Sequence, residues 1–166
     1  PVGMKNPTGG STCVMLNAIY AAQQPQNFIY RNWDVTTTGN PYAHAVLRGY
    51  KGLDDVNYPN YHFEYLERLA DAYCTGEYQN PAVIIDCNHD NSGKRPLEQP
   101  RIVNEVLGSC KRSEKIAGII RGFMIESYIE DGNQPVDGGV FGKSITDACL
   151  GWEKSERLIY DLAEQI

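Results

Sequence analysis

The sequence predicts an α/β fold in which four strand–helix units share one parallel sheet. Four short apolar runs each end at a charged residue or at a residue type that binds metals, and these residues are Lys5, Arg48, His89 and Glu126. They follow one another at intervals of about 40 residues, which leaves room for a strand, a returning helix and their loops. Alternating strands and helices build parallel sheets with right-handed crossovers, and the carboxyl ends of their strands share one edge. The spacing therefore predicts that the four side chains meet at that edge.

The first part of the chain is expected to hold a strand, a helix and a hairpin. A strand at residues 2–5 leads through a turn-rich stretch into a helix over 12–23, where apolar residues recur with the helical period. Two short β segments at 28–30 and 35–38 predict a hairpin. Residues 24–41 are therefore interpreted as an inserted region before the next strand.

The middle of the chain repeats the order of strand and helix. The apolar run at 43–47 predicts a strand, and a single apolar stripe predicts a helix at about 61–73. A strand over 82–86 follows, and a helix at about 99–107 comes after a stretch rich in turn-forming residues. The apolar run at 119–125 predicts the fourth strand.

The last part is expected to be a loop and two closing helices. Residues 130–142 are rich in Gly, Asp, Asn and Pro, and helical patterns follow near 145–150 and 153–165. Four strand–helix units make half of an eight-unit β/α barrel, and an open four-stranded sheet leaves two edges uncovered. We therefore expect a second copy, or a missing half, to cover these edges.

Length and composition fit one soluble domain over residues 1–166. The chain is 42% hydrophobic and 22% charged, as globular domains are. A net charge of −6 argues against nucleic acid as a partner, and no apolar stretch approaches the roughly 20 residues that cross a membrane. The chain starts at Pro1 and runs directly into a strand, so we expect a fragment or a processed chain.

The five cysteines predict reduced thiols. Their number is odd and no two of them have Cys-x-x-Cys spacing, which argues against a disulfide framework and a structural zinc site. Reduced thiols are typical of the cytoplasm, where we expect the protein to be. The cysteines are Cys13, Cys74, Cys87, Cys110 and Cys149.

Two cations stand at the expected strand ends. Lys5 and Arg48 suit an anionic ligand such as a phosphate or carboxylate, which arginine binds through two parallel hydrogen bonds. Solvated surface charge is the alternative interpretation. If Arg48 points to the inner face of the sheet, His44 shares that face and is expected to be a packed histidine rather than a ligand.

A mixed set of nitrogen and oxygen donors follows. His89, Glu126 and Asp147 suit a divalent transition metal better than calcium or structural zinc. The carboxylates could equally be general bases or partners in ion pairs. Asp86 and Asp90 flank His89, and either could orient its imidazole.

One long segment resembles a known family. Residues 142–153 are similar to the C-terminal signature of class I 3-deoxy-D-arabino-heptulosonate-7-phosphate (DAHP) synthases, which catalyse the first step of the shikimate pathway. Further blocks occur in the family's order over nearly the whole chain. These blocks are residues 1–6, 46–49, 84–92, 124–127 and 132–134.

The resemblance implies a TIM (β/α)8 barrel of about twice this length, of which this chain is the C-terminal half, strands five to eight. The predicted hairpin resembles the family's insertion before strand six. That insertion helps form the pocket through which aromatic amino acids inhibit many members. An aromatic amino acid is therefore a candidate effector, and a homo-oligomer is expected.

The resemblance also implies site residues. His89, Glu126 and Asp147 match three of the family's four metal ligands, for manganese, iron, cobalt or zinc. Lys5 and Arg48 match residues that bind phosphoenolpyruvate, and Lys5 and Asp147 are the candidate catalytic residues. The fourth ligand of the family is a cysteine in a Gly-Pro-Cys segment, which has no counterpart in these 166 residues.

The implied activity is that of a metal-dependent transferase of aromatic amino acid biosynthesis. The parent enzyme joins phosphoenolpyruvate to erythrose 4-phosphate and releases phosphate, and we expect the chain alone to be inactive. A non-catalytic homodimer of half-barrels that binds metal or phosphate weakly is the alternative. A third case is a half-enzyme that works with a separately encoded N-terminal half.

Overall fold

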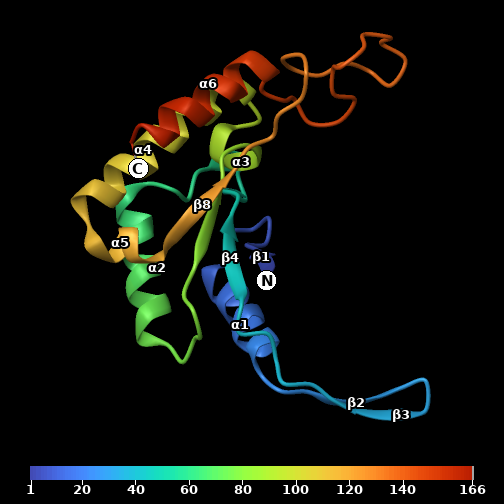
Figure 1. Cartoon of the computed structure of the whole chain (residues 1–166), viewed down its shortest axis with the longest axis vertical. Coiled ribbons are helices and arrows are strands. Elements are labelled where there is room, and N and C mark those ends of the chain that lie inside the picture. Colours follow the sequence, from blue (N-terminus) through green and yellow to red (C-terminus); the bar gives the residue numbers. More distant parts are fainter. Residues whose placement is uncertain (166) are drawn as a thin grey trace.

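The centre of the molecule is a four-stranded parallel sheet (Figure 1). The computed structural model describes residues 1–165. The strands lie in the order β1 (Val2–Lys5), β4 (Ala43–Leu47), β7 (Val83–Asp86) and β8 (Ile120–Met124), and every neighbouring pair is parallel. The predicted α/β fold with a parallel sheet is confirmed.

The helices lie close to their predicted bounds. The first, α1, spans Thr12–Gln23 as predicted, whereas α2 covers Phe63–Thr75 and so begins and ends two residues late. The next, α4, runs from Gln99 to Arg112, beyond its predicted end. The final helix, α6, covers Trp152–Ala163.

The core lies between the helices and one face of the sheet. Alternate strand residues such as Ala45, Leu47 and Ile85 are fully buried and pack with side chains from the helices. The opposite face carries His44 and Val46, which contact the position where a side chain on Gly3 would stand. This division follows from the alternation of side chains along a strand.

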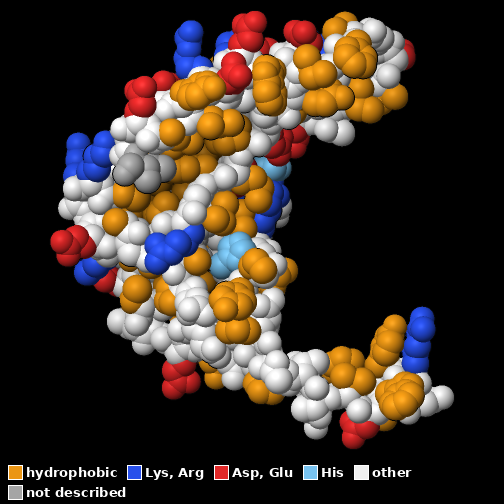
Figure 2. All heavy atoms as spheres, viewed as in Figure 1, with side chains coloured by type: hydrophobic (Ala, Val, Ile, Leu, Met, Phe, Trp, Pro, Cys, Tyr) orange, Lys and Arg blue, Asp and Glu red, His pale blue; other side chains and the backbone are white. Residues whose placement is uncertain are grey.

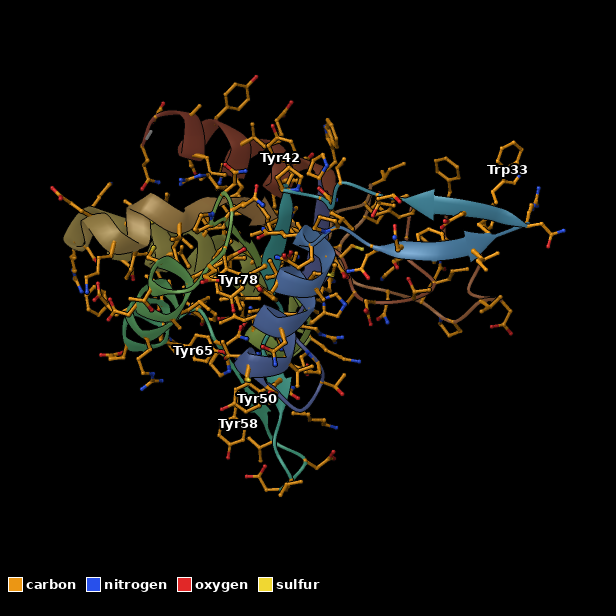
Figure 3. The ribbon with its side chains drawn as sticks, turned by 90° about the horizontal axis from the view of Figure 1, so that it is seen from below. Trp33, Tyr42, Tyr50, Tyr58, Tyr65 and Tyr78 are labelled. Atoms are coloured by element: carbon orange, nitrogen blue, oxygen red, sulfur yellow. The ribbon has the colours of Figure 1, made fainter. Side chains whose placement is uncertain are left out.

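Several short elements were not anticipated. They are α3 (His89–Ser92), α5 (Glu114–Ile119), a 3-10 turn at Pro96–Glu98 and the two-residue strands β5 (Tyr50–Lys51) and β6 (Asn57–Tyr58). The rings of Tyr50 and Tyr58 stack across β5 and β6 with their centroids 5.4 Å apart (Figure 3). Elements this short are fixed by tertiary contacts rather than by a repeating pattern.

The predicted helix at 145–150 is wrong. The segment pairs instead with the chain that follows β8, through isolated bridges between Gly132 and Cys149 and between Ser127 and Leu150. Gly132 N donates to Cys149 O at 2.8 Å, and Cys149 N donates back to Gly132 O at 3.1 Å. The six-residue segment has too few turns to nucleate a helix on its own, so these backbone partners decide its structure.

A hairpin of β2 (Asn27–Tyr30) and β3 (Trp33–Thr36) leaves the body of the molecule between α1 and β4 (Figures 1 and 3). Its two-residue turn, Arg31 and Asn32, has positive φ at both positions, as type I′ hairpins require. Figure 2 shows that the molecule is hollowed between this hairpin and the projecting segment before α6.

The two outer strands of the sheet each have one free edge among the described residues. Within residues 1–165, β1 and β8 each pair with a neighbour on one side only. None of the described helices combines the length and the apolar character needed to cross a membrane.

Candidate metal and anion site

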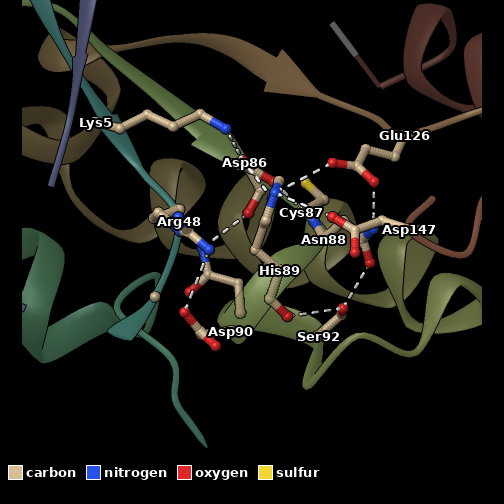
Figure 4. Close-up of polar contacts among 12 residues, drawn as sticks. Lys5, Arg48, Asp86, Cys87, Asn88, His89, Asp90, Ser92, Glu126 and Asp147 are labelled. Atoms are coloured by element: carbon tan, nitrogen blue, oxygen red, sulfur yellow. Dashed lines mark hydrogen bonds and ion pairs between the residues drawn. The ribbon is translucent and has the colours of Figure 1, made fainter. Parts of the chain in front are cut away.

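The carboxyl ends of the parallel strands bring ionisable side chains to one edge of the sheet (Figure 4). Lys5 is the last residue of β1, and Asp86 is the last residue of β7. Arg48 follows β4 directly, and Glu126 lies two residues after β8. The structure thus brings together, at one edge, side chains that are far apart in the sequence.

His89 enters this edge on an unusual backbone. It stands at the start of α3 with a φ of 46°, which is uncommon for a residue with a side chain and costs about 1–3 kcal/mol. The turn is held by backbone hydrogen bonds: Asp90 N donates to Arg48 O at 3.1 Å, and Lys94 N donates to His89 O at 2.8 Å. These bonds hold the backbone of His89 in this turn, next to the residue that follows β4.

Three donors converge on one point. His89 Nε2 lies 3.3 Å from Glu126 Oε1 and 3.6 Å from Asp147 Oδ2. One donor atom from each of the three residues lies within 4.8 Å of the others. An imidazole nitrogen with two carboxylates is a donor set that divalent transition metals accept. The residues present therefore fit a metal ion of this class.

Asp86 connects the imidazole to the nearest cation. Its side chain is fully buried, and its Oδ2 accepts a hydrogen bond from Lys5 Nζ at 2.8 Å. The same oxygen lies 2.9 Å from His89 Nδ1, although off the direction of an aligned hydrogen bond. Of the two acids considered from the sequence, Asp86 is the one that contacts the imidazole, which leaves Nε2 facing the carboxylates.

The other acid pairs with the second cation. Arg48 Nη2 lies 3.6 Å from Asp90 Oδ2, and Arg48 Nε is buried without a hydrogen-bond partner among residues 1–165. A further cation that the sequence did not single out, Lys94, places Nζ 3.9 Å from Asp147 Oδ1. Lys5, Arg48 and Lys94 thus place three cations near the donor set, which suits an anionic ligand beside it.

Buried amides that sequence reasoning missed fix the backbone around Arg48. Asn6 Oδ1 accepts from Arg48 N at 2.9 Å, and Asn60 Oδ1 accepts from Gly49 N at 2.8 Å. Asn91 accepts from Asn60 N at 2.9 Å. Only Asn6 directly follows a predicted strand, and without the fold an asparagine there is indistinguishable from one that serves a local turn.

The remaining candidates lie outside the donor group. Burial raises the pKa of the Cys87 thiol far above its usual range, and the side chain is part of the hydrophobic core. Burial also raises the pKa of Cys149. His44 is partly buried, and its Nδ1 lies 3.0 Å from Tyr42 O. None of the three contributes to the cluster of His89, Glu126 and Asp147.

Comparisons with known proteins identify chains that are similar to this one. Residues 1–159 match the model of the DAHP synthetase I family. The whole chain aligns with 47% of a Trp-sensitive phospho-2-dehydro-3-deoxyheptonate aldolase from Escherichia coli O6:H1, at 35% sequence identity. It also aligns with 46% of a Tyr-sensitive phospho-2-dehydro-3-deoxyheptonate aldolase from Salmonella typhimurium, at 36% identity. The chain therefore spans about half the length of the curated relatives that it matches.

A solved structure is similar as well. The phospho-2-dehydro-3-deoxyheptonate aldolase from Francisella tularensis superimposes with a TM-score of 0.84 and 30% sequence identity, over 99% of this chain and 47% of that one. At this coverage, the likeness extends over nearly the whole chain, including the parallel sheet.

Proposed function

The chain belongs to the DAHP synthetase I family, and from this premise we propose that it forms one half of a metal-dependent transferase. The whole enzyme would join phosphoenolpyruvate to erythrose 4-phosphate, release phosphate and so begin the shikimate pathway. The observation that supports this most is the meeting of two cations and a three-residue donor set at one sheet edge.

We propose that residues 1–166 form one domain, the half of a (β/α)8 barrel that holds strands five to eight. Two observations support this: β1 and β8 are open edges of a parallel sheet, and the matched solved structure is about twice as long. The hairpin region 24–41 would be the insertion before strand six.

Lys5 and Arg48 are proposed to bind phosphoenolpyruvate. Both are cations at strand ends, and each is held by a buried acid, Asp86 or Asp90. Arg48 offers a buried Nε that has no partner within the described chain. Holding the polyanion in one orientation lowers the entropic cost of bringing two substrates together.

His89, Glu126 and Asp147 would hold the divalent ion, which is manganese, iron, cobalt or zinc in this proposal. When bound, such an ion supplies Lewis-acid polarisation of the aldehyde oxygen of erythrose 4-phosphate. Asp147, whose side chain is 42% exposed, is the donor best placed to meet the incoming aldose. The family's fourth ligand, a cysteine, would come from the other half.

Lys5 and Asp147 are the proposed catalytic residues. Carbon 3 of phosphoenolpyruvate would attack the aldehyde carbon, and the aldehyde oxygen would take up a proton to become a hydroxyl group. Water would add at carbon 2 and give up its protons, and the bond from carbon 2 to the phosphate oxygen would break, which leaves a ketone and free phosphate. Lys5 Nζ would stay in contact with the phosphoenolpyruvate anion while these bonds form and break, because its hydrogen bond to Asp86 fixes its position.

An aromatic amino acid is the proposed effector of the whole enzyme, because the relatives are named Trp-sensitive and Tyr-sensitive. The β2–β3 hairpin, whose Trp33 is 74% exposed and points away from the body, is the proposed site (Figure 3). The five free cysteines fit the reducing cytoplasm, where we place the protein.

Reconstitution of the barrel tests this function. The chain alone should release no measurable phosphate from the two substrates with Mn²⁺, because the family's fourth metal ligand would come from the other half. Addition of the separately produced N-terminal half of a relative should give phosphate release. Arg48→Ala in the same mixture should lower the rate at least about 100-fold. Turnover by the chain alone, or an unchanged rate with Arg48→Ala, would contradict the proposal.

The open edges favour a second candidate, a non-catalytic homodimer. Pairing β1 of one copy with β8 of another would close an eight-stranded parallel barrel around a two-fold axis. Size-exclusion chromatography with light scattering distinguishes the cases: a monodisperse monomer of 18.6 kDa excludes this assembly.

A further inference from the structure

Asn88 lies at the centre of the three segments that carry the donor set (Figure 4). The residue is 1% exposed and directly precedes His89. Its Nδ2 donates to Glu126 Oε2 at 2.7 Å and to Ala148 O, next to Asp147, at 3.3 Å. One side chain therefore ties the ends of β7 and β8 to the segment before α6.

The orientation of this amide is determined by its partners. An ionised carboxylate and a backbone carbonyl can only accept hydrogen bonds, so the NH₂ group must face Glu126 and Ala148. The Oδ1 atom then faces Ser92, whose Oγ donates to it at 2.9 Å. Both the amide nitrogen and the amide oxygen of Asn88 therefore have hydrogen-bond partners, as a buried polar group requires.

The hydrogen bond from Asn88 orients the carboxyl group of Glu126. Its Oε2 is held by Asn88, while its Oε1 points toward His89 Nε2 at 3.3 Å. Its backbone is fixed separately, because Glu126 N donates to Gln99 Oε1 and Glu126 O accepts from Gln99 Nε2, both at 2.9 Å. The hydrogen bond from Asn88 is thus what selects a single rotation of the carboxyl group.

We propose that Asn88 is a positioning residue for metal binding, which presents Glu126 Oε1 as a one-oxygen donor and holds the Asp147 segment against it. This inference rests on the proposed metal site and adds a role to a residue outside the donor set. Without Asn88, the carboxyl group could turn and Ala148 would lose its partner. Removing hydrogen-bond partners of metal ligands typically weakens metal affinity about 10- to 100-fold.

Manganese binding to the chain as it stands tests this role. The dissociation constant for Mn²⁺, measured by EPR titration, should rise about 10- to 100-fold in Asn88→Ala. Asn104→Ala is the matched control, because Asn104 is an exposed amide on α4. This variant should bind Mn²⁺ as tightly as the wild type does. The absorption spectrum of bound Co²⁺ should also change in Asn88→Ala, since one carboxylate oxygen is no longer selected.

A second variant guards against a simple folding defect. Ser92→Ala keeps Asn88 but removes the hydrogen bond that orients its amide, and it should weaken Mn²⁺ binding by a smaller factor than Asn88→Ala does. The metal-free melting temperature separates the roles, because a purely structural residue lowers it without changing the dissociation constant.

The outcomes are distinct. An unchanged dissociation constant and Co²⁺ spectrum in folded Asn88→Ala and Ser92→Ala would overturn the positioning role and leave the metal site intact. Failure of the wild-type chain to bind Mn²⁺ or Co²⁺ would overturn the proposed metal site and this inference together.

Discussion

At the scale of single residues, the site depends on one buried carboxylate. Asp86 is fully buried, and its Oδ2 is shared between Lys5 Nζ and His89 Nδ1. A buried charge is tolerated only when it is paired and hydrogen-bonded. Lys5 is thus both a proposed ligand for phosphoenolpyruvate and the cation that pairs with the buried Asp86 side chain.

Replacing the cation should therefore destabilise the fold. We expect Lys5→Met to lower the free energy of unfolding by about 1–3 kcal/mol, because Asp86 loses its strongest partner. This loss of unfolding free energy is smaller than the loss expected for a fully buried ion pair, since the Lys5 side chain is 38% exposed. Urea denaturation without metal measures it. Lys111→Met, at the exposed end of α4, should change stability by less than about 0.5 kcal/mol. Equal effects of the two variants would contradict this account.

The sequence predicts which charged residues stand at the strand ends better than it predicts the buried amides that hydrogen-bond around them. Lys5, Arg48, His89 and Glu126 could be chosen because apolar runs end at them. Asn88 and Asn91 could not, because asparagine after a strand usually serves a local turn, and their partners lie as far away as Glu126 and Leu47. Long-range hydrogen bonds of this kind have no periodic signature.

At the scale of elements, α6 begins where a charged side chain meets its amino end. Asp131 Oδ1 accepts from Gly151 N at 2.7 Å, and Oδ2 pairs with Lys154 in the first turn. A negative charge at a helix amino terminus is favourable. The cap lies next to the bridge between Gly132 and Cys149, so both contacts hold the end of the segment that carries Asp147.

This cap predicts a pH dependence. The hydrogen bond from Lys154, and then that from Gly151 N, lowers the pKa of Asp131. A lowered pKa adds stability above the unfolded value of about 3.9, and this stability is lost as the pH falls through the folded value. Asp131→Asn keeps the acceptor but loses the charge, so it should cost about 0.5–1 kcal/mol at pH 7.

Urea unfolding measured from pH 7 to pH 3 checks this expectation. The difference between wild type and Asp131→Asn should shrink as the pH falls below about 4. Asp137→Asn, in the exposed loop, is the control and should differ little from wild type across the range. A difference for Asp131→Asn that stays constant with pH would show that the charge is not involved.

At the scale of the whole molecule, the fold is an open sheet with a one-sided core. The parallel pairing of the strands could be predicted because alternating strands and helices allow few topologies. The direction in which the hairpin projects could not, since no pattern in the sequence specifies where an inserted segment points. Within residues 1–165, β1 and β8 have no second strand neighbour, which agrees with a chain that spans about half of its relatives.

The central claim is that side chains from separate strands form one site that binds a divalent ion beside an anion. Mn²⁺ titration of the wild-type chain and of His89→Ala, followed by EPR with and without phosphoenolpyruvate, tests it most directly. The account predicts one bound ion per chain, at least tenfold weaker binding in His89→Ala, and a signal that phosphoenolpyruvate changes. Equal binding by the two proteins, or no binding by either, would contradict it.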